Sequence, residues 1–190
     1  MSCNNLTSII IPESITVIPD RCFQECGNLS NIILHDKISS LGVYAFYMCS
    51  LIKSINLTNT LTSIGDRCFN FCSELSDITI PNSVETIGMH AFSSCTKLSS
   101  ISIPPGITMI KNGTFYGTGL TSITIPSSAT TIGISAFQNC PNLTSVIIEG
   151  KTITINDSAF KNCYNLSNLD VSKLSGDSYI YNEAFKNTSI

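Results

Sequence analysis

The chain has 190 residues, of which 43% are hydrophobic and 12% are charged, and its formal net charge is −3 at pH 7. This hydrophobic content excludes intrinsic disorder, which requires low hydrophobicity and high net charge. The 10 Lys and Arg residues are spread singly along the chain, so the sequence offers no basic patch for nucleic acid or for an anionic membrane surface.

Apolar runs are short, and the first one extends only over residues 9–11. A transmembrane helix needs about 20 apolar residues, and a secretory signal needs a basic segment followed by an apolar stretch. We therefore expect no membrane insertion. We expect the chain as written to be intracellular and cytoplasmic, or to be at the cell surface or secreted if it is a fragment of a longer protein.

A repeat of about 23 residues organises the whole sequence. Eight of the nine Phe residues recur at spacings of 22, 23 or 25 residues: Phe23, Phe46, Phe69, Phe92, Phe115, Phe137, Phe160 and Phe185. Five residues before each of them stands an Ile or a Leu, and directly before it stands a small residue, Cys, Ala or Thr. This regularity predicts like units that stack with their Phe residues in the same place.

Each repeat opens with an apolar anchor, and apolar and polar residues alternate after it. The anchors in chain order are Leu6, Leu29, Ile52, Leu75, Leu98, Leu120, Leu143 and Leu166. The alternation is clearest as L-S-S-I-S-I-P from Leu98 to Pro104. A period of two predicts a half-buried strand there.

One complete unit reads C-x-x-L-x-x-I-x-I-P-x-x-V-x-x-I-G-x-x-A-F-x-x, from Cys72 to Ser94. A period of 20 to 29 residues with one strand per repeat is typical of a leucine-rich-repeat solenoid. We predict a single, mainly β solenoid over residues 1–190, with short strands on the concave face and short strands, turns or 3-10 segments on the convex face. Its repeats start near residues 3, 26, 49, 72, 95, 117, 140 and 163.

The glycine of this unit is replaced in four repeats, by Pro19, Lys111, Asn156 and Tyr181. We expect that the backbone at this slot favours a positive φ but does not require it.

The recurrence of L-x-x-I-x-I-P, I-G-x-x-A-F and a trailing Cys, as in Ile80 to Cys95, closely resembles the BspA-like leucine-rich repeats, also called the Treponema pallidum type. The resemblance covers residues 3 to 190. Such repeats occur in surface proteins of host-associated bacteria and in large families of parasitic protists. The resemblance implies protein binding and, in secreted members, adhesion to host matrix or to neighbouring cells.

Six of the nine cysteines share one slot, three residues after the Phe, and Thr118 and Thr188 hold the same slot in other repeats. A slot that accepts either Cys or Thr specifies a small volume rather than thiolate chemistry. We therefore expect buried structural thiols and no metal or cofactor. Disulfides and a metal site are the less favoured alternatives.

Catalysis has little support in the sequence. The two histidines, His35 and His90, occupy different slots, both in expected surface turns, and no nucleophile elbow, P-loop or zinc-protease motif occurs. A stack of near-identical units also lacks the converging unlike groups that catalysis needs. We expect a protein that is not an enzyme.

The solvent-facing side of the strands is the remaining candidate site. If the anchor and the residues three and five positions after it point inward, the residues two and four positions after it point outward on the concave face. We call this set the ladder face: Ser8, Ile10, Asn31, Ile33, Ser54, Asn56, Asp77, Thr79, Ser100, Ser102, Ser122, Thr124, Ser145, Ile147, Asn168 and Asp170. Its small polar side chains favour a solvated sheet, and the alternative is a weak or multivalent contact surface.

Neither end of the predicted solenoid carries the polar cap that normally covers an apolar cross-section. The residues expected to be exposed are Leu6, Ile9, Ile11, Ile15, Ile18 and Phe23 at one end and Leu166, Leu169, Val171, Ile180 and Phe185 at the other. We therefore expect end-to-end contacts, or contacts of an end with a protein partner.

Taken together, these features predict a non-catalytic protein–protein interaction scaffold, and the family resemblance implies adhesion to host or neighbouring cells as one role. The alternative is a structural component of a larger intracellular assembly or filament.

Overall fold

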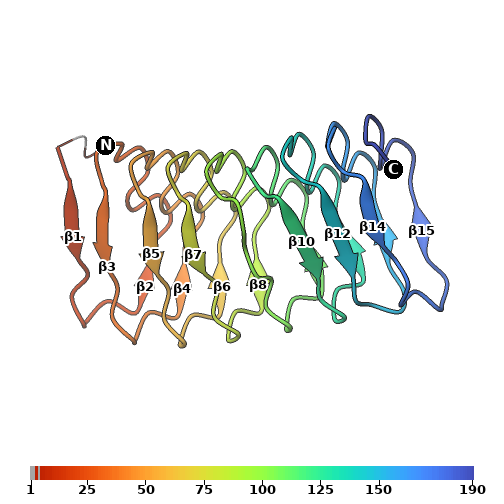
Figure 1. Ribbon diagram of the computed structural model, residues 1–190. Helices are drawn as coiled ribbons and strands as arrows, with labels where there is room; N and C mark the ends of the chain where they lie inside the picture. Colours follow the sequence, from red (N-terminus) through yellow and green to blue (C-terminus); the bar gives the residue numbers. More distant parts are fainter. Residues whose placement is uncertain (1–2, 4) are drawn as a thin grey trace.

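Two rows of short parallel strands run along the molecule, and the chain alternates between the rows (Figure 1). The structure is a computed structural model that describes residue 3 and residues 5–190. We number the coils 1 to 8 by their repeated Phe, from Phe23 in coil 1 to Phe185 in coil 8. The coils stack side by side into a rod, and the two termini lie at opposite ends of it (Figure 1).

The front row contains β1 (Ser8–Ile10), β3 (Asn31–Ile33), β5 (Ser54–Asn56), β7 (Asp77–Thr79), β10 (Ser122–Ile125), β12 (Ser145–Ile148) and β14 (Asn168–Asp170). The back row contains β2 (Val17–Ile18), β4 (Ser40–Leu41), β6 (Ser63–Ile64), β8 (Thr86–Ile87), β9 (Met109–Ile110), β11 (Thr131–Ile132), β13 (Thr154–Ile155) and β15 (Tyr179–Ile180). The predicted mainly β solenoid is therefore confirmed.

Paired strands place equivalent slots of neighbouring coils side by side. Ile55 pairs with Ile78 in the front row, and Ile64 pairs with Ile87 in the back row, both in parallel register. The front row divides into β1-β3, β5-β7 and β10-β12-β14, and the back row into β2-β4-β6-β8 and β15-β13-β11-β9. Because neither row joins coil 4 to coil 5, this junction depends on other contacts.

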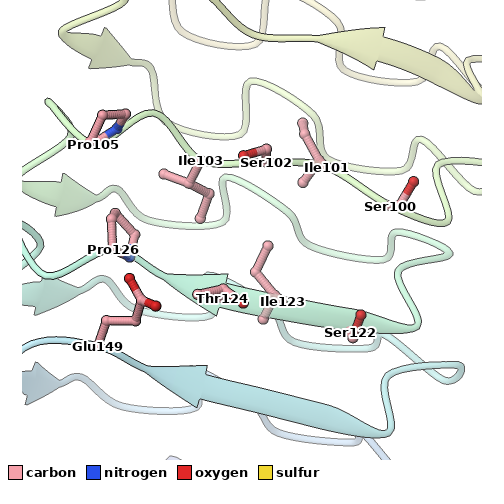
Figure 2. Close-up of a pocket in the computed structure, with 10 residues that line it drawn as sticks. All are labelled: Ser100, Ile101, Ser102, Ile103, Pro105, Ser122, Ile123, Thr124, Pro126 and Glu149. Atoms are coloured by element: carbon pink, nitrogen blue, oxygen red, sulfur yellow. The ribbon is translucent and has the colours of Figure 1, made fainter. Parts of the chain in front are cut away.

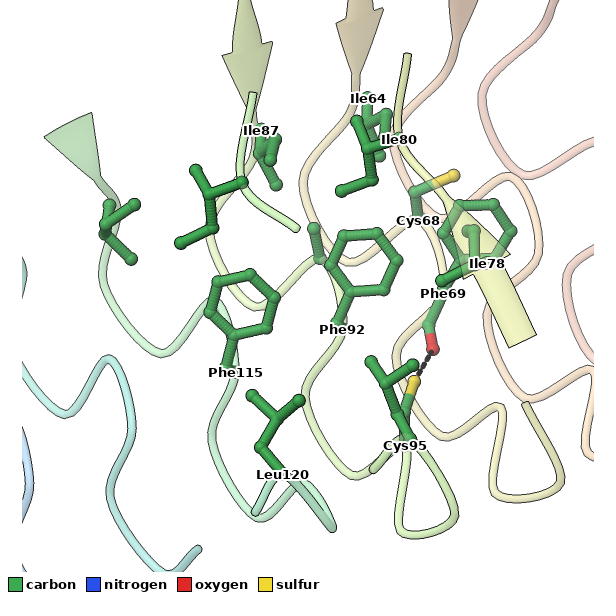
Figure 3. Close-up of a cluster of buried hydrophobic side chains, with 14 of the residues drawn as sticks. Ile64, Cys68, Phe69, Ile78, Ile80, Ile87, Phe92, Cys95, Phe115 and Leu120 are labelled. Carbon is green, nitrogen blue, oxygen red and sulfur yellow. Dashed lines mark hydrogen bonds between the residues drawn. The ribbon is translucent and has the colours of Figure 1, made fainter. Parts of the chain in front are cut away.

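The repeated Phe residues form one continuous stack along the rod. Neighbouring rings lie 5.1 to 5.7 Å apart between centroids, with interplanar angles of 1° to 14°. Figure 3 shows Phe69, Phe92 and Phe115 in this stack, with the inward Ile side chains around them. The rings from Phe46 to Phe160 are fully buried, as the 23-residue spacing predicts.

The turn that carries each Phe contains two residues with left-handed backbone, two positions before and two positions after the Phe. In coil 3 these residues are Arg67, with φ 53°, and Phe71, with φ 61°. Their N–H groups donate to the carbonyl oxygens of Met89 and Ser93 in coil 4, at 2.8 and 2.9 Å. This row of turn hydrogen bonds therefore holds coil 4 to coil 3, and equivalent bonds join coil 5 to coil 4.

The expectation of a positive φ at the repeat glycine is wrong. Gly88 does not have a positive φ, and a Cβ at this position would clash with the backbone of Asp66 and Gly65 in coil 3. Close approach of neighbouring coils therefore explains the glycine. Positive φ occurs instead at Gly113, where a Cβ would also clash with the imidazole of His90.

Candidate functional site

The ladder-face residues lie at outward positions of the front row. All of them are exposed except Ser145, which is half-buried. Along β5 the burial alternates between exposed Ser54, buried Ile55 and exposed Asn56. The alternation of residue types thus predicts correctly which side chains leave the core.

The two ends of the ladder face differ in chemistry. At the N-terminal end, Ile10 and Ile33 are 70% and 48% exposed and are paired in register. At the C-terminal end, hydrogen bonds from Ser172 lower the pKa of Asp170 below its usual value. An apolar pair therefore lies at one end of the face and an ionised carboxylate at the other.

The strand predicted from Leu98 to Pro104 does not form. Residues 100–103 keep the alternation, since Ser100 and Ser102 are exposed and Ile103 is buried. In the described part of the chain, however, no backbone hydrogen bond joins residues 100–103 to β7 or to β10. The alternation of apolar and polar residues decides which side chains point inward. Pairing between strands also requires the neighbouring backbones to lie within hydrogen-bond distance.

This break lies between two hollows of the ladder face. The hollow between coil 5 and β10 has a volume of about 400 Å³, and Figure 2 shows its lining. The residues that line it are Ser100, Ile101, Ser102, Ile103, Pro105, Ser122, Ile123, Thr124, Pro126 and Glu149. The second hollow, of about 390 Å³, lies between β7 and coil 5 and is lined by Asp77 and Thr79 among others.

The hollows bring hydroxyl groups next to backbone groups that have no ladder partner. Ser100 and Ser102 supply both the hydroxyl groups and the backbone groups. The Glu149 carboxylate adds a negative charge, and the Lys173 ammonium nitrogen lies 3.9 Å from it. The hydroxyl and backbone groups both donate to and accept from a polar ligand or an extended chain, whereas the carboxylate only accepts. Pro105 is not among the residues predicted from the sequence, although the doublet Pro104-Pro105 distinguishes coil 5 from the other repeats.

The cysteine slot is a hydrogen-bonding position as well as a small one. The thiol of Cys72 donates to the carbonyl oxygen of Phe46, at 3.2 Å. The thiols in the same slot of other coils repeat this contact with the Phe of the preceding coil, namely Cys49, Cys95, Cys140 and Cys163. The expectation that the cysteines are buried holds for seven of them but is wrong for Cys3 and Cys22, which are exposed. These two residues lie at the first coil, which has a described neighbour on one side only.

The histidines are more enclosed than surface turns would suggest, since both are half-buried. His35 Nε2 lies 2.9 Å from the carbonyl oxygen of Pro12. Burial, followed by the nearby Arg67 charge, lowers the pKa of His90. Neither ring lines a hollow of the ladder face.

The two end coils are only partly open. Ile15 and Ile180 are 39% and 60% exposed, as predicted. Ile11, Ile18, Phe23 and Leu166 are buried instead, because they pack in the hydrophobic core. The exposed apolar surface at coil 8 includes Tyr179 and Tyr181.

Solved structures resemble this chain over most of its length. The T. pallidum leucine-rich repeat protein superposes with a TM-score of 0.79 at 24% identity, covering 85% of this chain and 78% of that one. A leucine-rich cell surface protein from Faecalibacterium prausnitzii A2-165 gives a TM-score of 0.61 at 24% identity, covering 92% of this chain and 61% of that one. A leucine-rich repeat protein from Bacteroides ovatus gives a TM-score of 0.54 at 25% identity, covering 98% and 65%. These likenesses concern the fold.

No curated protein matches the sequence. Among the described residues, no helix has the length and apolar character needed to cross a membrane. The sequence does match the BspA type leucine-rich repeat region, over residues 1–104 and 64–190, with six copies of the repeat. Repeat motif, strand register and family match agree, and the chain belongs to the BspA type leucine-rich repeat family.

Proposed function

We propose that this protein is a non-catalytic scaffold that binds a protein partner through the ladder face at coil 5. The observation that carries the proposal is the front segment of coil 5, because residues 100–103 have no ladder partner on either side and lie between two hollows. The row is also interrupted between β3 and β5, but each of these strands is paired on its other side. Unpaired backbone groups are strong hydrogen-bonding sites. An extended segment of a partner could pair with them.

The side chains around the break suit such a contact. Ser100, Ser102 and Thr124 are exposed and are short, so holding them in one conformation costs little entropy. Asp77 and Glu149 line the two hollows and give them negative charge. A polar partner segment with amide or basic groups matches this surface best.

The test uses the intact chain and a library of displayed protein domains. Binders selected on the wild-type chain are then measured against Ser102→Arg, which fills the hollows, and against Thr108→Arg on the back side of the same coil. We expect Ser102→Arg to abolish binding and Thr108→Arg to leave it unchanged. Binders that tolerate both substitutions equally would contradict a site at coil 5.

We further propose that the partner is a protein on the surface of a host cell or a neighbouring cell, and that this chain acts as an adhesion module. The family membership supports this role, and the similar F. prausnitzii chain is a cell surface protein. Immunolabelling of intact and permeabilised source cells tests it. Labelling only after permeabilisation would favour an intracellular scaffold.

The second candidate function is a structural part of an assembly, in which another copy or a further coil covers coil 8. Ile180 and Tyr179 support it, because both belong to the end strand β15 and are 60% and 64% exposed. Light scattering over a range of concentrations tests this contact. A mass that rises with concentration for the wild type and not for Ile180→Lys supports assembly, and a constant monomer mass for both contradicts it.

A further inference from the structure

A second group of side chains lies on the Phe-bearing turns of coils 1 to 3, outside the ladder face. Arg21, Tyr44 and Arg67 occupy the same slot in three consecutive coils, two residues before the Phe. The guanidinium carbons of Arg21 and Arg67 each lie 5.5 Å from the centroid of the Tyr44 ring. Arg67 also donates from a terminal guanidinium nitrogen to the Tyr44 hydroxyl, at 2.7 Å. The tyrosine therefore holds both guanidinium groups in place.

Aromatic contacts extend this group toward a second slot, two residues after the Phe. Tyr44 packs edge-on against Tyr47, at 5.2 Å between centroids, and Tyr47 packs edge-on against Phe71, at 6.0 Å. Phe71 is 45% exposed, and Met48, in the same slot one coil earlier, is 42% exposed. We call Arg21, Tyr44, Tyr47, Met48, Arg67 and Phe71 the arginine–aromatic cluster.

The backbone beneath the cluster is an unusual place for large side chains. Tyr44, Met48 and Phe71 have φ values of 58°, 58° and 61°. A bulky residue with positive φ is an outlier, and the same slots in later coils hold residues such as Gly113 and Asn139. The left-handed backbone itself recurs in every Phe-bearing turn, so the large side chains, and not the backbone, distinguish these three positions. The same turns form in later coils with small residues such as Ser135 and Ser158 in these slots, so the turn itself does not require large ones.

The charges of the cluster are available to a partner. Arg21 and Arg67 are the two arginines of the chain, and among the residues that the structure describes, every ion pair is made by a lysine. The neighbouring Asp20 and Asp66 carboxylates accept hydrogen bonds from the backbone, at 2.7 Å each. Both guanidinium groups therefore lack a carboxylate partner.

We propose that the arginine–aromatic cluster docks an acidic segment of a partner protein, with carboxylates on Arg21 and Arg67 and an apolar side chain against Met48 and Phe71. Guanidinium groups bind carboxylates through paired hydrogen bonds. Arg, Tyr, Phe and Met are enriched in protein interfaces, and Arg and Tyr in their hot spots. The ladder face lacks these residue types, so the two surfaces differ in the partner they suit.

Random 12-residue peptides displayed on phage and selected on the whole chain test the proposal. We expect enriched peptides to combine Asp or Glu with an aromatic or aliphatic residue. Measured by fluorescence anisotropy, the peptide should bind the double variant Arg21→Gln, Arg67→Gln at least ten-fold more weakly. The matched control is Lys53→Gln, Lys151→Gln, which removes two lysines that form no ion pair with any residue the structure describes and should leave the affinity unchanged.

A second measurement separates binding from folding. Labelled methionine methyl groups should show a peptide-induced shift at Met48 and none at Met109 in coil 5. The variant Phe71→Asn places a residue that tolerates positive φ at that site, and it should lose peptide binding without a lower melting temperature.

Three outcomes would overturn the proposal. They are enriched peptides without acidic residues, equal affinity for the two double variants, and binding of heparin fragments in place of peptides, which would indicate a sulfated glycan as the occupant.

Discussion

The thiol of Cys95 donates a hydrogen bond to the carbonyl oxygen of Phe69, 3.1 Å away in the preceding repeat (Figure 3). Both residues are fully buried. The cysteine column therefore links the repeats through hydrogen bonds as well as through volume. Thr118 fills the same slot and donates to Phe115 of its own turn, at 3.0 Å.

Replacement of this thiol should show which property matters. We expect Cys95→Ala to lower the free energy of unfolding by about 1–2 kcal/mol, because the thiol hydrogen bond and its volume are both lost. Cys95→Thr keeps a donor of similar size and should cost less. Urea denaturation of both variants measures the difference, and a threonine variant less stable than the alanine variant would refute the hydrogen-bond role.

Thiol labelling should distinguish two classes of cysteine. In the native chain we expect rapid alkylation of Cys3 and Cys22 only, since these two are exposed and the other seven are buried. After denaturation all nine should react. Mass spectrometry of the labelled protein counts the modified thiols, and more than two fast sites in the native state would contradict the buried column.

Stability should fall in alkaline solution because of the buried thiols. Burial, with the nearby Cys26 as a second cause, raises the pKa of Cys49 from 9.0 to about 12. The folded state therefore holds this proton more tightly than the unfolded state. The stabilising effect is complete below pH 9 and is lost between pH 9 and 12, with a slope of up to about 1.4 kcal/mol per pH unit for one group.

The control for this pH dependence is Cys49→Thr, in which one titrating thiol is absent. Its melting temperature should fall less steeply than that of the wild type between pH 9 and 11. Identical slopes in differential scanning calorimetry would show that Cys49 does not set the dependence.

Loss of a Phe should cost more in the middle of the stack than at its end. Phe92 is fully buried and stacks on Phe69 and Phe115. Phe185 is half-buried and, among the described residues, stacks only on Phe160. Removing a buried Phe typically costs about 3–5 kcal/mol. We expect Phe92→Ala to reach that range and Phe185→Ala to stay well below it. Thermal melts of the two variants provide the comparison, and equal shifts would argue against nearest-neighbour stacking.

Hydrogen exchange should reveal the break in the front row. The amides of residues 100–103 have no ladder partner, whereas β10 (Ser122–Ile125) is paired with β12 along its whole length. We expect the former to exchange much faster than the latter, since protection reflects the stability of the hydrogen bonds. Equal protection in both segments would mean that residues 100–103 pair with a neighbouring coil in solution.

Periodicity by itself determined most of the fold. Because a solenoid brings each residue next to its counterpart about 23 positions later, the recurrence of Phe69, Phe92 and Phe115 was enough to predict the stack. The alternation at Ser54, Ile55 and Asn56 was likewise enough to predict the outward side chains of β5. These features depend only on which slots are neighbours, and the sequence contains that information.

The tertiary structure decided how closely the neighbours approach one another. Ser100 and Ser102 follow the same pattern as other strands, yet their backbone lacks ladder bonds, because hydrogen bonding depends on ångström-scale spacing between coils that no residue pattern records. The close approach at Gly88 and the left-handed φ of Phe71 are consequences of the same packing. The contact of Tyr44 with Arg21 and Arg67 was predictable in part. An alignment of the repeats places the three residues in one slot, but only the folded turns show that Tyr44 contacts both arginines.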